Sequence, residues 1–127
     1  MSELLGQNYF NSNPLESPSW AKAMGEQTPK PPAANIPIFI SEGTADEVVL
    51  ANSTAALQVQ WCKAGVDLTM QWLGELKHEQ VGVASAPAVT NWIHDRFEGE
   101  STTPNCSIAP PVEPYEPSVA VPPIPSS

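Results

Sequence analysis

Basic residues are scarce in this chain of 127 residues. Five Lys and Arg side chains stand against 14 Asp and Glu side chains, which gives a formal net charge of -9. Nucleic acids and anionic lipid surfaces bind proteins mainly through basic patches that release counterions. A chain with so few cations offers no such patch, so neither nucleic acid nor an anionic membrane surface is expected as a partner.

Long apolar runs and cysteines are also few. No apolar stretch approaches the roughly 20 residues that a membrane-spanning helix needs, so no transmembrane segment is expected. The opening residues, MSELLGQNYF, have neither the basic flank nor the apolar centre of a secretory signal, and no signal peptide is expected in this chain. The two cysteines, Cys62 and Cys106, are too few to define a disulfide scaffold and would be free thiols in a reducing compartment.

Proline is abundant but unevenly distributed, and it divides the chain into three parts. Eight of the 15 prolines lie at or after Pro104. Residues 1–35 form a turn-rich, irregular segment with one short helix expected over residues 20–26. Residues 36–106 have regular periodicity, and residues 107–127 are expected to be an extended or disordered tail without a core.

The periodic part predicts alternating strands and helices. Residues 36–40 are almost continuously apolar, which is typical of a strand buried on both faces of a parallel sheet, and residues 66–72 alternate apolar and polar side chains as a second strand does. The helix between them is predicted to have Asn52 or Ser53 as its N-cap and Gly65 in a left-handed conformation after its end.

A second helix is predicted after the second strand. Ser85 is the expected N-cap, Pro87 suits the first turn, and Gly99 ends the helix. The order strand, helix, strand, helix predicts an α/β fold with a right-handed parallel βαβ unit. Because two strands would leave a sheet edge and an apolar face without partners, we expect them to be the end of a larger sheet.

A binding or catalytic site is expected at the carboxyl ends of the strands, where ligands of parallel sheets bind. The loop after the first strand, EGTADEVV, carries Asp46, and the loop after the second, GELKHEQ, carries His78. This order is that of hydrolases whose nucleophile, acid and histidine follow one another along the chain. Asp46 would fix the tautomer of His78, and the imidazole would act as general base toward a serine. Gly43 is expected to let the chain turn sharply, so that Asp46 faces the active site.

Other readings of these residues remain open. Asp46 and Glu47 are also acceptable as solvated loop acids, and His78 as a loop histidine without chemistry. His94 lies off the apolar face of its predicted helix and is expected to face solvent. The acids around His78 do not match the spacing of a strong zinc or calcium site, so no metal ion or other cofactor is expected.

Several short motifs resemble the secreted lipases of the lipase A type, which have the α/β-hydrolase fold. They are PIFISEG, G-x-x-D-E-x-V, W-C-x-x-G, WIHDRFEG and the closing NC, all within residues 36–106. The resemblance implies that this region is the C-terminal portion of an α/β-hydrolase sheet, with Asp46 and His78 as members of a Ser-Asp-His triad. It also implies a disulfide between Cys62 and Cys106 and an extracellular parent enzyme that hydrolyses acylglycerols or other apolar carboxylic esters.

One motif of that family is missing from these 127 residues. Its nucleophile lies in a G-x-S-x-G turn, and no two of the seven glycines here stand four residues apart. We therefore expect the isolated chain to be inactive as a lipase, because loss of one triad member costs several orders of magnitude in rate. Two interpretations follow. In the first, the chain is the acid-and-histidine portion of an ester hydrolase whose nucleophile lies on an N-terminal portion. In the second, it is a non-catalytic remnant or accessory chain that pairs with another polypeptide through its sheet edge.

Overall fold

The computed structural model describes residues 12–116 of the chain, and these divide between two compact units. Residues 12–30 belong to the first, which contains the short 3-10 helix η1 (Pro14–Glu16) and the helix α2 (Pro18–Gln27). The helix begins two residues before the predicted 20–26 because Pro18 occupies its first turn, where the missing N–H costs nothing.

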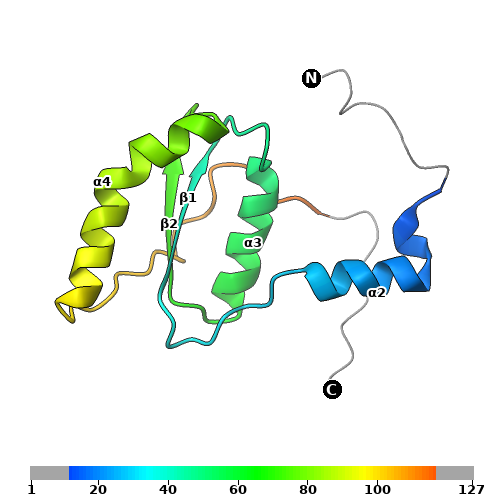
Figure 1. Ribbon diagram of the computed structural model, residues 1–127, viewed down its shortest axis with the longest axis horizontal. Helices are drawn as coiled ribbons and strands as arrows, with labels where there is room; N and C mark the ends of the chain where they lie inside the picture. Colours follow the sequence, from blue (N-terminus) through cyan, green and yellow to red (C-terminus); the bar gives the residue numbers. More distant parts are fainter. Residues whose placement is uncertain (1–11, 117–127) are drawn as a thin grey trace. The chain divides into compact units, whose positions relative to one another are not determined.

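Residues 31–116 form the second unit, which holds the parallel sheet (Figure 1). Its elements follow the predicted order of strand, helix, strand and helix: β1 (Ile38–Gly43), α3 (Ala51–Lys63), β2 (Leu68–Leu73) and α4 (His78–Phe97). The two strands pair in parallel, from Ile38 opposite Leu68 to Gly43 opposite Leu73. The predicted mixed α/β character and the parallel pair are therefore present.

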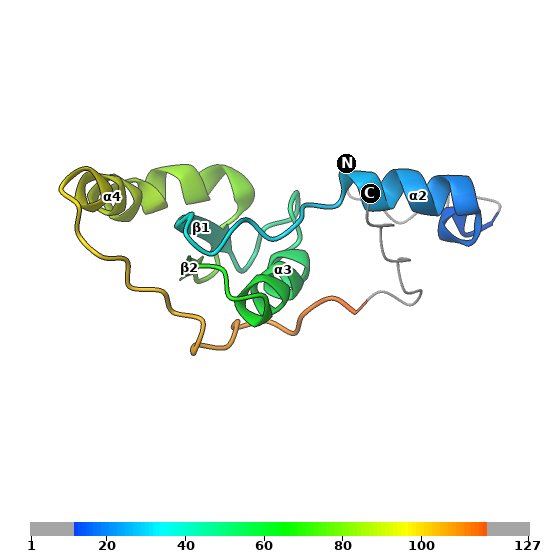
Figure 2. The same cartoon turned by 90° about the horizontal axis from the view of Figure 1, so that it is seen from below.

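The two helices lie on opposite faces of the sheet, which is seen edge-on between them in Figure 2. The α3 face holds the main core, in which Val66, Leu68 and Met70 are buried and Trp61 packs against them. On the α4 face the ring centroids of Phe39 and Trp92 are 5.7 Å apart. Successive side chains of a strand point to opposite faces, so β1 directs its even-numbered residues toward α3 and its odd-numbered residues toward α4.

The first strand is displaced from the predicted range of residues 36–40. Pro37 has no N–H to give to the ladder, and β1 begins after it. The strand then continues through two polar residues whose side chains have partners. Ser41 Oγ bonds Gln71 Oε1 at 3.0 Å, and Glu42 Oε2 accepts a 2.7 Å hydrogen bond from a hydroxyl of α3. Polar residues that make such contacts do not end a strand.

The starts of both helices in this unit differ from the sequence prediction. The N-cap of α3 is Leu50, so the prediction of Asn52 or Ser53 was wrong. The predicted start of α4 at Ser85 was also wrong, because the helix begins at His78 and continues through Pro87. The ends agree with the prediction: Gly65 and Gly99 follow the helices with φ of 79° and 74°, values that favour glycine.

The two edges of the sheet are different. Asn105 closes the outer edge of β2: its amide N–H donates to Leu68 O, its side-chain Nδ2 donates to Met70 O, and its Oδ1 accepts from Met70 N. In a parallel ladder alternate residues face the partner strand, so Ile38 bonds β2 while Phe39 and Ser41 direct their amides outward. Within residues 12–116 these outward amides of β1 have no acceptor.

After Asn105 the chain has no further helix or strand in the described region, and it runs along α3. The side chain of Gln58 donates to Ile108 O at 2.9 Å, and Tyr115 N donates to Asn52 O at 2.8 Å. Residues 117–127, the rest of the predicted tail, lie outside the described residues. None of the helices in the described part of the chain is long and apolar enough to cross a bilayer.

Candidate functional site

The loops that follow the two strands are bound to one another. Thr44 N donates to Leu73 O at 3.0 Å, Ala45 N donates to Leu76 O at 3.2 Å, and Glu75 N donates to Thr44 Oγ1 at 2.8 Å. These hydrogen bonds fix the loop of Asp46 against the loop that leads to His78. The strand ends therefore position the two side chains that the sequence places after them.

The chain turns sharply after Gly43, as expected, and Asp46 N donates to Gly43 O at 3.2 Å. Gly43 is also required where the two loops meet, for a reason that the sequence does not suggest. It does not have a positive φ, so a left-handed turn is not its role. A Cβ atom built on Gly43 would lie 2.2 Å from Leu76 O and 3.0 Å from the side chain of Val81. The glycine lets the two loops approach closely, because any larger residue would push them apart.

Asp46 is held by the backbone that follows it. Its Oδ1 accepts hydrogen bonds from the amides of Val48 at 2.8 Å and Val49 at 2.9 Å, which is a typical aspartate turn. Its Oδ2 lies 2.8 Å from Nδ1 of His78. Because an ionised carboxylate only accepts hydrogen bonds, Nδ1 carries the proton of this contact.

His78 is the first residue of α4. Lys77 caps the helix, and its amide donates to Oε1 of Gln80 at 2.9 Å, which fixes the helix start directly beside the loop of Asp46. The side chain of Asp46 is 3% exposed and that of His78 is 49% exposed. Among residues 12–116 the ring makes its one hydrogen bond through Nδ1, so Nε2 is left for a further partner.

The charge of Asp46 is maintained in spite of its burial. Burial by itself raises the pKa of a carboxyl group. The pKa of Asp46 is lowered by a hydrogen bond from His78, by hydrogen bonds from the amides of Val48 and Val49, and by the charge of His78. The net result is that the pKa of Asp46 lies below its usual value. Asp46 is therefore an ionised acceptor that fixes the orientation and the tautomer of His78.

A second buried carboxyl group, that of Glu42, lies near the end of β1, before the loop that carries Asp46. Glu42 is 5% exposed and accepts a 2.7 Å hydrogen bond from Thr54 Oγ1 through Oε2. The sequence pattern placed Glu42 in the loop EGTADEVV, after the predicted strand, whereas the structure places it inside β1. The signal was its register: Glu42 shares the inward, even-numbered positions of Ile38 and Ile40.

The remaining polar residues around the pair are on the surface. Lys77 Nζ and Glu47 Oε2 lie 3.7 Å apart, and both side chains are largely exposed. His94 is exposed on α4, as expected. Within residues 12–116 no group of three or more His, Cys, Asp or Glu side chains is arranged to hold a metal ion.

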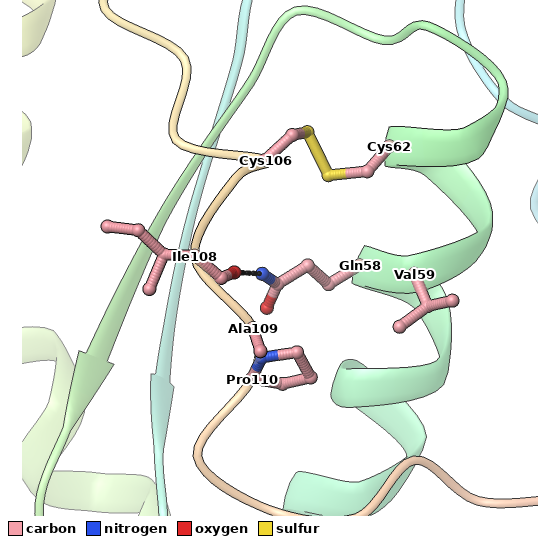
Figure 3. A pocket seen from close by; sticks show the side chains of 7 residues that line it. All are labelled: Gln58, Val59, Cys62, Cys106, Ile108, Ala109 and Pro110. Carbon is pink, nitrogen blue, oxygen red and sulfur yellow. Dashed lines mark hydrogen bonds between the residues drawn. A yellow bond between two sulfur atoms is a disulfide. The ribbon is translucent and has the colours of Figure 1, made fainter.

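A pocket of about 230 Å³ lies elsewhere, between α3 and the segment that follows Asn105 (Figure 3). The disulfide between Cys62 and Cys106 forms one end of it, and the hydrogen bond from Gln58 to the carbonyl of Ile108 crosses it. Neither Asp46 nor His78 lines the pocket, and no titratable side chain does. Its position shows how the disulfide ties the C-terminal segment to α3.

Known proteins resemble this chain over most of its length. A family model described as "Secretory lipase" matches residues 9–105. Lipase 5 of Candida albicans is 33% identical over 73 residues, which cover 56% of this chain and 16% of that protein. The secreted triacylglycerol lipase LIP7 of Malassezia globosa is 29% identical over 94 residues, which cover 72% of this chain and 20% of that protein. The chain thus spans a fifth or less of the length of these relatives. No solved structure matches it.

Proposed function

This chain belongs to the secretory lipase family, and from this membership we propose that it supplies the acid and the histidine of a Ser-Asp-His triad. The observation that carries the proposal is the 2.8 Å contact between Asp46 Oδ2 and His78 Nδ1. Asp46 and His78 act in a carboxylic ester hydrolase whose sheet is the larger α/β-hydrolase sheet. The serine, in a G-x-S-x-G turn, lies on an N-terminal portion outside these 127 residues.

The geometry of the pair is suited to general base catalysis. Asp46 accepts a hydrogen bond from the protonated Nδ1, and in this tautomer the lone pair of Nε2 is free. Nε2 takes the proton of the serine hydroxyl as the serine oxygen attacks the ester carbonyl, and then gives that proton to the departing alcohol. A water molecule, activated by the same nitrogen, releases the acid from the acyl-serine. Throughout, the ionised Asp46 stabilises the imidazolium form of His78.

The substrate class and the location follow from the family. One relative is a secreted triacylglycerol lipase, and we propose that the complete enzyme acts on acylglycerols or other apolar esters outside the cell. The disulfide between Cys62 and Cys106 supports an oxidising compartment, because such bonds are rare where glutathione keeps thiols reduced.

The test is reconstitution of the site. We expect the pure 127-residue chain to leave a short-chain nitrophenyl ester unhydrolysed. Mixed or co-expressed with the segment of a related secretory lipase that carries G-x-S-x-G, it should gain turnover. In that mixture His78→Ala should lower kcat/KM by about 10³-fold or more, because the general base is lost.

The matched control is His94→Ala, which removes an exposed histidine from the same helix. It should leave the rate of the mixture unchanged. Turnover in the mixture that survives His78→Ala would contradict the triad role of that residue. Turnover by the isolated chain that His78→Ala abolishes would contradict the need for a separate nucleophile.

A second candidate function is that of a non-catalytic accessory chain that pairs with another polypeptide through β1. The outward amides of Phe39 and Ser41, which have no acceptor within residues 12–116, favour it. In the mixing experiment, a stable complex without ester hydrolysis would support this reading. The genomic DNA upstream separates the two further, since an in-frame G-x-S-x-G motif favours the enzyme and a stop codon favours the accessory chain.

A further inference from the structure

Glu42 is a buried carboxyl group near the catalytic pair that the proposed mechanism does not use. It is 5% exposed, at the end of β1, and faces α3. Its Oε2 accepts the hydroxyl of Thr54 at 2.7 Å, whereas Oε1 is buried and has no hydrogen-bond donor within residues 12–116. A buried carboxylate oxygen without a donor is costly, and native structures avoid it.

A proton on Glu42 removes this cost. As a carboxylic acid, Glu42 presents a hydroxyl group that donates a hydrogen bond instead of requiring one. We take the carboxyl group of Asp46 as the acceptor, because its charge and a hydrogen bond with it both raise the pKa of Glu42. Asp46 is the partner that remains ionised, since it also accepts two backbone amides and the His78 ring.

We propose that Glu42 is a positioning residue that holds a proton and donates it as a hydrogen bond to Asp46. The Asp46–His78 pair thereby becomes a chain of three groups, in which Asp46 accepts hydrogen bonds from both Glu42 and His78. Because Glu42 is neutral in this state, it adds no second negative charge to the pair. The role in catalysis rests on the proposed function, whereas the position of the proton does not.

The surroundings of Glu42 agree with a proton at this site. Burial raises the pKa of Glu42 above the usual 4.5, and Asp46 adds to the rise through its charge and its hydrogen bond. The hydrogen bonds from Thr54 and from the backbone of Gly43 oppose the rise without cancelling it. On the facing elements, β2 presents Trp72 opposite Glu42, and the first turn of α3 has no acidic residue. Lys63, in the last turn of α3, is the basic residue of that helix, and it is exposed. At the surface, Glu47 and Lys77 pair with each other.

The test is a carboxyl-carbon NMR titration of the 127-residue chain. In the unaltered chain, Glu42 should titrate above the usual glutamate value of 4.5. Two variants separate the hydrogen bond from burial: Glu42→Gln keeps a donor toward Asp46, and Glu42→Leu removes it. We expect the titration midpoint of Asp46 to rise in Glu42→Leu and to stay at its unaltered position in Glu42→Gln, because a donor to an ionised group favours the ionised form.

The Nδ1 proton of His78 gives a second readout of the same chain. Its exchange with solvent should be about tenfold faster in Glu42→Leu than in Glu42→Gln, since a charge-assisted hydrogen bond that holds Asp46 has been lost. The exposed Glu98→Gln serves as the control and should change neither readout.

Three results would overturn the proposal. They are a Glu42 midpoint at the value of an unstructured chain, an Asp46 midpoint that is the same in all variants, and equal displacement of that midpoint by Gln and Leu. None of these readouts requires ester hydrolysis. A failed reconstitution would therefore contradict the proposed function alone, and a failed titration would contradict the role of Glu42 alone.

Discussion

The two carboxylate oxygens of Asp46 have separate partners, and this division makes the residue sensitive to acid. Oδ1 accepts the amides of Val48 and Val49, and Oδ2 faces His78. Because the pKa of Asp46 is lowered in the folded chain, its ionised form stabilises the fold at pH values above the unfolded value of 3.8. That contribution is lost as the pH falls through the lower, folded pKa.

Asp46→Asn should therefore lose stability in a pH-dependent manner. The difference in unfolding free energy between the unaltered chain and the variant should be largest above about pH 5 and should shrink as the pH falls below the unfolded value. Urea unfolding at a series of pH values measures it. Asp95→Asn, an exposed change in α4, is the control and should show no such trend. A difference that stays constant down to pH 2 would show that the charge of Asp46 is not involved.

At the scale of single residues, the sequence predicted those site residues that follow a strand along the chain. Asp46 and His78 were candidates because each directly follows a strand, and the structure brings them together. Glu42 was not a candidate, since only the three-dimensional packing of Thr54 against it shows that this glutamate is buried. The sharp turn expected at Gly43 is present, because Asp46 N donates to Gly43 O at 3.2 Å. The constraint that demands glycine is the approach of Leu76, which no local pattern reveals.

At the scale of elements, α4 is an informative departure from the sequence prediction. Pro87 suggested a helix start, but it lies inside the helix and is exposed. Its ring leaves the carbonyl of Val83, four residues earlier, without the usual donor. The helix nevertheless begins at His78, because Gln80 caps its first turn and Val81 packs against the loop crossing at Gly43. Tertiary contacts of this kind override local preference, and a single sequence does not display them.

Pro87→Ala should therefore stabilise the chain. It restores a backbone hydrogen bond within α4, and we expect the free energy of unfolding to rise by about 1–3 kcal/mol. Chemical denaturation followed by far-ultraviolet circular dichroism measures the change. Pro111→Ala, in the exposed segment outside any helix, should leave the stability within error. Equal effects of the two substitutions would indicate that the gain does not come from the helix.

Asn105 completes β2 with a side chain in the place of a third strand. Asn105→Ala removes both side-chain hydrogen bonds to Met70. We expect a loss of about 2 kcal/mol in unfolding free energy, because two backbone groups lose their partners at once. Asn91→Ala, an exposed change in α4, is the matched control for the same thermal or urea denaturation. If the two variants were equally stable, closure of this edge by Asn105 would be energetically unimportant.

At the scale of the whole molecule, residues 31–116 combine a closed sheet edge, an open sheet edge and a disulfide next to the closed edge. The disulfide joins Cys62 of α3 to Cys106, the residue after Asn105, across a sequence separation of 44. A loop of this length corresponds to roughly 4 kcal/mol on the chain-entropy estimate. The bond therefore restrains the segment that closes β2, while nothing comparable covers β1 within residues 12–116.

Hydrogen exchange on the purified chain should display this asymmetry. We expect slow exchange for the amide of Ile40, which faces β2, and for the amide of Met70, which donates a hydrogen bond to Asn105 Oδ1. The amides of Phe39 and Ser41 should exchange quickly, because they face away from β2. Addition of the nucleophile-bearing segment should slow their exchange. Uniformly fast exchange along both strands would show that the chain needs that segment in order to fold.

The inequality of the two edges also limits how copies of this chain can associate. An open strand edge attracts other strands, and chains with two such edges polymerise without limit. Asn105 occupies the far side of β2 at Leu68 and Met70, so we expect edge pairing between copies to join β1 to another β1. Such a contact uses the same surface on both partners, so two-fold symmetry closes it at a dimer. Through the open edge of β1 the described part of the chain can pair with one neighbour.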